Sequence, residues 1–182
     1  LFTMEAELCK GINKWINPKP FDASKDWNGK KILLIRPGGY GDIIFMTPTI
    51  RRIKELWKDC KIEISCRPAF MQILENNPHV SALHEYPIKI KKLESFDAIH
   101  CFESALEDSK SKNRHAVDTF AEEIGIVLTD KKTELFLTEE EIKWAKMEFP
   151  KVGKKRLAYQ SHCSSKIRQF PINIIEGALT LL

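Results

Sequence analysis

The chain has 182 residues, of which 43% are hydrophobic and 30% charged, with a formal net charge of +4. This balance is typical of a globular protein with one domain, or one domain and part of a second, and it excludes the disordered and fibrous classes. No apolar stretch approaches the roughly 20 residues of a membrane-spanning helix, and the first residues lack the order of a secretory signal, so a cytoplasmic protein is expected.

Basic residues are interleaved with acidic ones except in short clusters such as KIKK at 89–92. Such a cluster is typical of a solvated loop; the alternative is a phosphate-rich partner or peripheral contact with a membrane surface. Aromatic and basic residues do not interleave as on a single-strand binding platform, so no nucleic-acid partner is predicted. The cysteines form no CxxC pair, and His100 has no carboxylate or second histidine at ligand spacing, so no metal site is predicted. No feature indicates an oligomeric state.

Residues 1–30 are predicted to form an N-terminal extension, an amphipathic helix followed by a Pro-rich connector. Beyond it, short apolar runs predict strands at 31–36, 61–66, 80–86, 96–102 and 156–160.

Helical periodicity fills the segments between these strands. The best pattern runs from 42 to 58 and is interrupted by Pro48, where the helix either kinks or restarts with Thr47 as its N-cap. Further helices are predicted at 68–76, 113–125 and 138–149.

Strands that alternate with helices predict an α/β fold, in which residues 31–150 form a Rossmann-like parallel sheet with helices on both faces. From residue 151 a charged, Gly-containing linker leads to a new strand, a polar loop and a new helix. Residues 151–182 are therefore predicted to begin a second domain.

The first strand-to-helix turn reads PGGYGD, residues 37–42. In open parallel sheets ligands bind beyond the carboxyl ends of the strands, and this turn is the favoured place. Its glycines permit close backbone approach, and the following helix offers N–H groups to an oxygen-rich ligand. The spacing of Gly38, Gly39 and Gly41 matches neither GxGxxG nor a phosphate loop with its lysine.

Asp42, at the start of the predicted helix, has two interpretations. Aspartate is a preferred N-cap residue, so it could simply cap the helix. It could also be a general base, which requires a substrate hydroxyl within hydrogen-bond reach and an electrophile on the far side of that hydroxyl. The residues alone leave both open.

The stretch KILLIRPGGYGDIIFMTPTIRRIKELWKDC, with ENNPHV at 75–80, resembles the amino-terminal half of the ADP-heptose:lipopolysaccharide heptosyltransferases, glycosyltransferase family 9. RHAVDTFAEEIGI at 114–126 is similar to the family's His-containing helix, and QSHCSSKIRQFP at 160–171 resembles the loop that opens its carboxy-terminal domain. The resemblance spans residues 31–182 and depends on the order and spacing of these motifs.

This resemblance implies the N-terminal half of a GT-B architecture, in which two Rossmann-like domains face each other across a cleft. It implies metal-independent, inverting transfer of a sugar from a nucleotide diphosphate donor, ADP-heptose in the family, to a lipopolysaccharide or related glycolipid acceptor. It implies no cofactor besides that donor, and a cytoplasmic enzyme, with peripheral contact at the inner membrane as a further possibility.

The resemblance also implies roles for individual residues. Asp42 takes the position of the base, and Gly39 and Gly41 line the approach of the acceptor. Arg36 either binds an acidic acceptor sugar or is a surface arginine at the end of a strand.

Residues Ser164, Ser165, Lys166 and Arg168 resemble the segment that binds the donor's phosphates, although the family often has Lys and Trp-Pro where this chain has Arg168 and Phe170-Pro171. The alternative is a solvated basic loop. Because the chain ends about one helix into the second domain, these 182 residues alone are expected to be inactive. The competing function is a non-catalytic Rossmann-like module that binds a carbohydrate or a protein partner.

Overall fold

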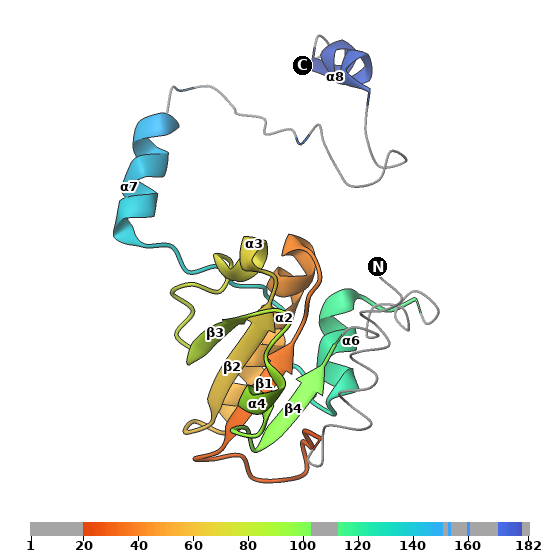
Figure 1. The fold of residues 1–182 in the computed structure, drawn as a ribbon. Helices are drawn as coiled ribbons and strands as arrows, with labels where there is room; N and C mark the ends of the chain where they lie inside the picture. Colours follow the sequence, from red (N-terminus) through yellow and green to blue (C-terminus); the bar gives the residue numbers. More distant parts are fainter. Residues whose placement is uncertain (1–19, 103–112, 151–152, 154–159, 161–170, 180–182) are drawn as a thin grey trace. The chain divides into compact units, whose positions relative to one another are not determined.

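A computed structural model of the chain describes residues 20–102, 113–150, 153, 160 and 171–179 (Figure 1). The chain divides into two compact units, Leu1–Thr138 and Glu139–Leu182. Most of the extension predicted over 1–30, and the strand predicted at 156–160 apart from its last residue, lie outside the described residues.

A four-stranded parallel sheet forms the centre of the first unit. Its strands are β1 (Lys31–Ile35), β2 (Lys61–Cys66), β3 (Ala82–Glu85) and β4 (Ala98–Cys101). Their order is β3-β2-β1-β4, so the chain passes from β1 to β2 and β3 on one side and then crosses back to place β4 on the other. The sheet therefore has its topological switch point between β1 and β4. The four strands predicted in this part of the chain are confirmed.

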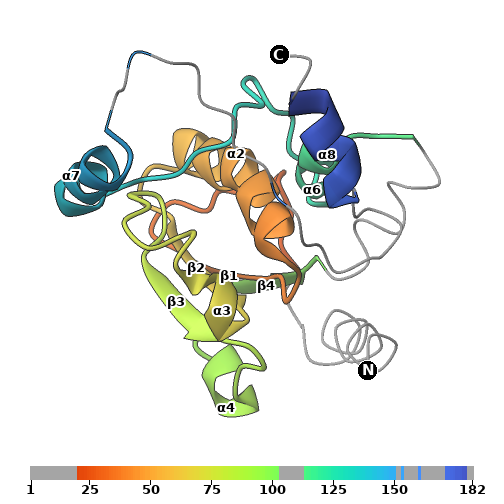
Figure 2. The ribbon, with the colours of Figure 1, turned by 90° about the horizontal axis from the view of Figure 1, so that it is seen from above.

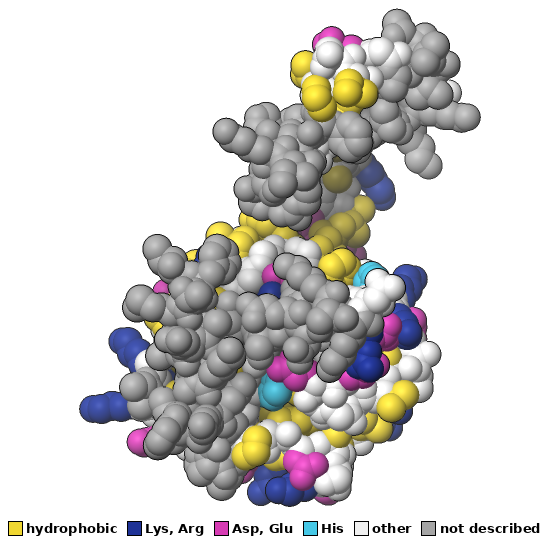
Figure 3. Space-filling model, turned by 90° about the vertical axis from the view of Figure 1, so that its right-hand side faces the viewer, with side chains coloured by type: hydrophobic (Ala, Val, Ile, Leu, Met, Phe, Trp, Pro, Cys, Tyr) yellow, Lys and Arg dark blue, Asp and Glu magenta, His cyan; other side chains and the backbone are white. Residues whose placement is uncertain are grey.

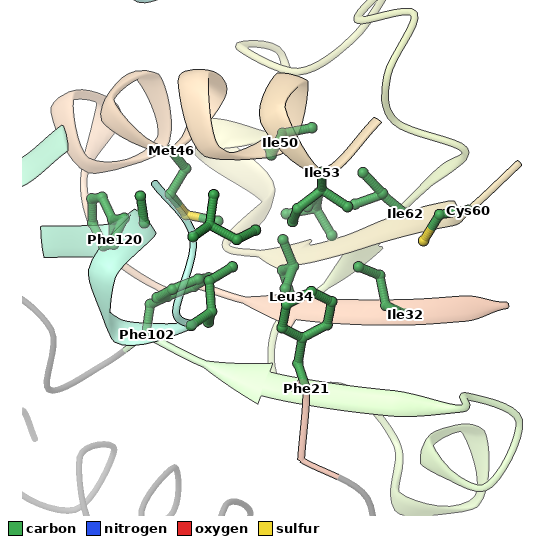
Figure 4. Close-up of a cluster of buried hydrophobic side chains, with 14 of the residues drawn as sticks. Phe21, Ile32, Leu34, Met46, Ile50, Ile53, Cys60, Ile62, Phe102 and Phe120 are labelled. Atoms are coloured by element: carbon green, nitrogen blue, oxygen red, sulfur yellow. The ribbon is translucent and has the colours of Figure 1, made fainter. Parts of the chain in front are cut away.

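One face of the sheet carries the larger part of the hydrophobic core. Helices α2 (Tyr40–Leu56) and α6 (Ala116–Glu123) both lie on this side (Figures 1 and 2). Ile32 and Leu34 of β1 are fully buried against side chains of these helices, including Ile50 and Phe120 (Figure 4). The alternation along β1 and the three-and-four spacing along α2 thus bury the side chains that the sequence pattern predicted.

The opposite face buries a smaller cluster. Leu33 and Ile35 of β1 pack with Leu93 and Phe96, which belong to α4 (Ile90–Leu93) and the turn that follows it. Figure 2 shows α4 on the side of the sheet away from α2. The predicted α/β class, a Rossmann-like parallel sheet with helices on both faces, is confirmed, with a single-turn helix on this second face.

Helix α2 runs without a break through Pro48, so a restart with Thr47 as N-cap is wrong. Proline has no N–H, and it therefore leaves the carbonyl of Ile44 without its usual i+4 donor. The hydroxyl of Thr47 donates to that carbonyl at 2.8 Å and accepts from the N–H of Glu134 at 2.9 Å. Thr47 thus compensates for the proline and ties segment 127–134 to the helix.

Two arginines of α2 hold the same segment. Arg51 donates to the carbonyls of Lys132 and Asp130, each at 3.0 Å, and pairs with the carboxylate of Glu134 at 2.6 Å. Arg52 donates to the carbonyl of Val127 at 3.2 Å. These basic residues contributed to the family resemblance, and in the structure they bind segment 127–134 of the same chain.

The helix predicted over 68–76 is much shorter in the structure. Only α3 (Pro68–Met71) is helical, and turns follow to Asn76, which has a φ of 62°. A positive φ is incompatible with continuing a right-handed helix. The periodicity of PAFMQILEN reflects packing of its turns on the core, where Leu74 is buried, rather than a regular helix.

Helix α6 lies inside the predicted range 113–125. His115 begins it as the N-cap, since its Nδ1 accepts from the N–H of Val117 at 3.3 Å. Gly125 ends it with a φ of 73°, a backbone conformation that favours glycine. The sequence expectation of a helix that stops at Gly125 is confirmed.

The second unit contains α7 (Glu139–Glu148) and α8 (Ile172–Leu179) in its described part. Both expose large hydrophobic side chains, among them Trp144 and Met147 on α7 and Ile172 and Ile174 on α8. Figure 3 shows hydrophobic side chains on the surface of the second unit. Among the helices that the structure describes, none is long and apolar enough to cross a membrane.

Candidate functional site

The loop after β1 leads directly to the start of α2. Gly39 is the N-cap of this helix, with extended backbone, and Asp42 is its third residue. One carboxylate oxygen of Asp42, Oδ2, accepts from the N–H of Gly39 at 3.0 Å. Asp42 therefore satisfies one of the unpaired N–H groups at the helix start, and its charge is favourable near the positive end of the helix dipole.

Arg36, the first residue after β1, holds the same oxygen. Its Nη2 donates to Asp42 Oδ2 at 2.9 Å, and its Nη1 donates to the carbonyl of Phe102 at 2.7 Å. The guanidinium also lies over the ring of Phe120, 5.6 Å from its centre. Phe102 directly follows β4, so Arg36 joins the carboxyl ends of the two strands that flank the switch point.

Burial differs between the two partners of this ion pair. The side chain of Arg36 is 7% exposed, whereas that of Asp42 is 24% exposed. Both hydrogen bonds that Asp42 makes to the described residues go to Oδ2, and Oδ1 has no partner among them. A carboxylate held by one oxygen and partly open at the other is suited to accept a hydrogen bond, or a proton, from a bound ligand.

The three glycines of the loop differ in what surrounds them. A Cβ at Gly38 would lie 2.1 Å from Asp42 Oδ2 and 2.7 Å from Arg36 Nε, so no other residue fits there without moving the ion pair. Among the residues that the structure describes, a Cβ at Gly39 or Gly41 would meet nothing within 4 Å. Sequence reasoning selected the latter two and missed Gly38, because the side chains that pack over Gly38 are known only from the folded loop.

An aromatic residue that sequence reasoning also missed begins α2. Tyr40 is 45% exposed, its ring meets that of Phe70 edge-on with centres 4.8 Å apart, and its hydroxyl accepts from Gln72 Nε2 at 2.8 Å. Tyr40 lies two residues before Asp42 in the same helical turn. Its exposed ring therefore adds an ordered aromatic surface to the carboxyl edge of the sheet.

The histidines near this edge have local partners. His100 Nε2 lies 3.0 Å from Glu123 Oε1, and its ring packs edge-on against Phe102. His115 caps α6 and contacts the ring of Phe45. In the part of the chain that the structure describes, no group of three or more His, Cys, Asp or Glu side chains could hold a metal ion.

A separate row of polar side chains, two lysines, a glutamate and a histidine, crosses the opposite face of the sheet. Glu63 on β2 is buried between Lys31 of β1, at 2.9 Å, and His84 of β3, at 2.5 Å. Burial alone would raise the pKa of the Glu63 carboxyl, but hydrogen bonds from His84 and Lys31 outweigh it and hold this pKa below its usual value. Lys92 Nζ lies 3.0 Å from the other ring nitrogen of His84. These groups satisfy one another and stabilise strand pairing.

The donor-phosphate residues predicted from the family resemblance, Ser164, Ser165, Lys166 and Arg168, lie outside the described residues. Of the predicted site residues, the structure therefore brings together Arg36 and Asp42 through the ion pair, with Gly39 bonded to the same oxygen. Gly41 lies beside them in the first turn of α2.

The parallel strand order β3-β2-β1-β4, with helices on both faces, defines the first unit as a Rossmann-like α/β domain, and Asp42 lies at the carboxyl edge of its sheet. A crystal structure of similar fold is that of the glycosyl transferase family 9 from Veillonella parvula DSM 2008, with a TM-score of 0.64 and 14% sequence identity. The match covers 84% of this chain and 60% of that one, so the chain spans about three fifths of the length of that protein.

This likeness shows that the chain has a glycosyltransferase-like fold. No protein-family model matches the sequence. No curated protein matches it either.

Proposed function

We propose that the protein is a glycosyltransferase of family 9, which transfers a sugar from a nucleotide diphosphate sugar to a hydroxyl of a glycan acceptor. The observation that carries this proposal is the carboxylate of Asp42, held through Oδ2 beyond the carboxyl ends of β1 and β4. The fold shared with a glycosyl transferase of this family supports it.

In the proposed reaction, Asp42 acts as the general base. The acceptor hydroxyl donates a hydrogen bond to Oδ1 while its oxygen attacks the anomeric carbon of the donor sugar. A new carbon–oxygen bond forms as the bond to the diphosphate breaks, the proton passes to Asp42, and the diphosphate leaves with the electron pair. Attack opposite the leaving group inverts the anomeric centre, and no metal is required for the proton transfer.

The surroundings of Asp42 favour this role over capping alone. Capping and pairing use Oδ2, so both can persist while Oδ1 accepts a proton. No described residue lies within 4 Å of a Cβ at Gly39 or Gly41, which would give an acceptor sugar room to reach the carboxylate. Tyr40, 45% exposed, offers an aromatic surface for a sugar to lie against.

The finer identity of the substrates is proposed from the family resemblance. We propose ADP-heptose as the donor and a lipopolysaccharide core or related glycolipid as the acceptor, used at the cytoplasmic face of the inner membrane. Ser164, Ser165, Lys166 and Arg168 are the residues proposed to bind the donor's diphosphate, with hydroxyl and cationic groups that suit phosphate oxygens. Residues from about 151 onward are proposed to begin the donor-binding domain.

The test is sugar transfer by the full-length protein. The assay measures the release of nucleoside diphosphate from ADP-heptose in the presence of a lipopolysaccharide acceptor. Asp42→Asn keeps the size of the side chain but removes the base, and we expect turnover to fall about 100- to 10,000-fold while the acceptor still binds. Asp59→Asn, at an exposed site between α2 and β2, is the matched control and should leave turnover unchanged.

Two results would reject the proposal. If Asp42→Asn keeps turnover within a few-fold of wild type, Asp42 is not the base. If the wild-type protein binds the glycan but transfers sugar from no nucleotide donor, it is a carbohydrate-binding module instead. A thermal shift with the glycan measures that binding separately from transfer.

Gly41→Ala tests the approach of the acceptor. Gly41 is the second residue of α2, and the Cβ of an alanine there would meet no described residue within 4 Å, so the substitution should stabilise the helix by up to about 1 kcal/mol. In an enzyme whose acceptor passes this position, the added methyl group should also raise the acceptor KM. Higher stability with an unchanged acceptor KM would remove Gly41 from the proposed site.

A further inference from the structure

Arg36 was expected to contact the acceptor or to be a surface residue, but its side chain is buried and engaged at both ends of its fork. One Nη donates to the carboxylate of Asp42 and the other to the carbonyl of Phe102, and the guanidinium plane lies over Phe120. At 7% exposure this side chain presents almost no surface to a ligand. Arg36 can therefore affect a bound ligand only through the groups that it contacts.

Gly38 supplies a second, independent observation. Its φ is not in the left-handed region, so the backbone conformation does not require glycine. The absence of a side chain is needed instead because the Asp42 carboxylate and the Arg36 guanidinium lie directly over its Cα, where a Cβ would come within 2.1 Å and 2.7 Å of them. The loop is thus shaped around this ion pair.

We infer that Arg36 and Gly38 are positioning residues for Asp42. Arg36, anchored on the carbonyl at the end of β4, holds Oδ2 of Asp42 so that Oδ1 is presented to the acceptor hydroxyl. Gly38 leaves the room in which the pair lies. This inference rests on the proposed function, because it assigns the two residues to the orientation of the proposed base.

The anchor explains why arginine is needed. Asp42 is at the first turn of a helix, and its carboxylate could turn about its own bonds if only the N–H of Gly39 held it. The planar fork of Arg36 fixes it against the far strand of the switch point. Lysine at position 36 would keep the positive charge. Its single ammonium group, however, lacks the two coplanar nitrogens with which the guanidinium binds the carboxylate and the carbonyl at once. A base held in this way needs little reorganisation when the proton moves.

The kinetic test uses Arg36→Lys, Arg36→Met and Gly38→Ala in the full-length protein. We expect each to lower kcat about 10- to 100-fold and to leave the acceptor KM within about two-fold, because the lost interaction aligns the base rather than binding the sugar. In the Asp42→Asn background, Arg36→Met should cause no further loss. Arg52→Met, which removes an arginine of α2 bound to Val127 and Glu55, is the matched control and should leave kcat unchanged.

A direct acceptor contact predicts a different pattern. Loss of Arg36 would then raise the acceptor KM, and the loss would persist in the Asp42→Asn background. Either result overturns the positioning role. If Arg36→Met fails to fold, which circular dichroism would show, Gly38→Ala carries the test alone, since it displaces the carboxylate without removing a charge.

A second readout needs no substrate. The N–H of Gly39 donates to Asp42 Oδ2, so its hydrogen exchange, measured by NMR, reports whether the carboxylate is in place. Arg36→Met and Gly38→Ala should raise this exchange toward the value of Asp42→Ala, whereas Gly41→Ala should not change it. Unchanged exchange in both variants would show that neither residue positions the carboxylate. Faster exchange together with full turnover in Asp42→Asn would instead reject the proposed function alone.

Discussion

Thr47→Val is the substitution whose effect on stability the structure defines best. The side chain is fully buried, and valine has nearly the same shape, so packing changes little. What is lost is the hydroxyl, which donates to the carbonyl of Ile44 and accepts from the N–H of Glu134. Both backbone groups would lose a partner in a partly buried setting.

The magnitude follows from these two bonds. A hydrogen bond contributes about 1 kcal/mol net, and the carbonyl of Ile44 lacks its i+4 backbone donor because residue 48 is proline. Thr47→Val should therefore lower the free energy of unfolding by about 2 kcal/mol. With a urea m-value of about 2 kcal/mol/M, the midpoint of unfolding falls by about 1 M.

The assay is urea unfolding followed by fluorescence of the buried tryptophans, Trp27 and Trp57. Thr49→Val is the matched control, two residues further along α2. The Thr49 hydroxyl is buried without a hydrogen-bond partner among the residues that the structure describes. Its removal should be neutral or slightly stabilising, because an unsatisfied buried hydroxyl costs free energy.

A third variant tests the link to the proline. Pro48→Ala restores an N–H that can bond to the carbonyl of Ile44, so Thr47→Val should cost about 1 kcal/mol less in that background. The reasoning is refuted if Thr47→Val and Thr49→Val have equal effects. If Pro48→Ala leaves the cost of Thr47→Val unchanged, the Thr47 hydroxyl does not compensate for the proline.

Three further predictions concern pH, a chain segment and thiol reactivity. The pKa of Glu63 is lower in the folded than in the unfolded protein, where it is near 4.5. The stability that ionised Glu63 contributes is therefore complete above about pH 4.5 and is lost as the pH falls through the folded pKa. Glu63→Gln should flatten the acid side of a plot of urea midpoint against pH. Arg51→Met should speed amide exchange and proteolysis within segment 127–134 and cost about 1 to 3 kcal/mol in unfolding, and equal protection in variant and wild type would contradict this. Burial raises the pKa of the Cys60 and Cys66 thiols to about 11, so an alkylating reagent at about pH 8 should modify them only after denaturation, as intact mass would show.

Local pattern was sufficient for most of the first unit. Alternating and continuous apolar runs located all four strands of the sheet, and the three-and-four spacing after Asp42 located α2 and the face that it buries. These features follow from nearest neighbours along the chain, because a strand or helix in a parallel sheet must bury a predictable set of positions. The same pattern failed over 68–76, where packed turns show helical spacing without a helix.

Proline at residue 48 shows where pattern reasoning reaches its limit. Its helix-breaking tendency is local, but the hydroxyl that compensates for it also bonds to a backbone N–H 87 residues away. Segment 127–134 held by Thr47, Arg51 and Arg52 could not be anticipated, since nothing in its own sequence indicates where on α2 it lies.

By itself, the sequence determined a parallel α/β sheet and a glycine loop with a carboxylate after its first strand, because burial periodicity and a strand-to-helix turn depend on residues that are close together along the chain. Only the tertiary structure decided which groups hold that carboxylate. The carbonyl that anchors Arg36 is 66 residues further along the chain, and the parallel crossover to β4 brings it to the loop. The ion pair of Arg36 and Asp42 then occupies the space over Gly38. A side chain at position 38 would therefore collide with it.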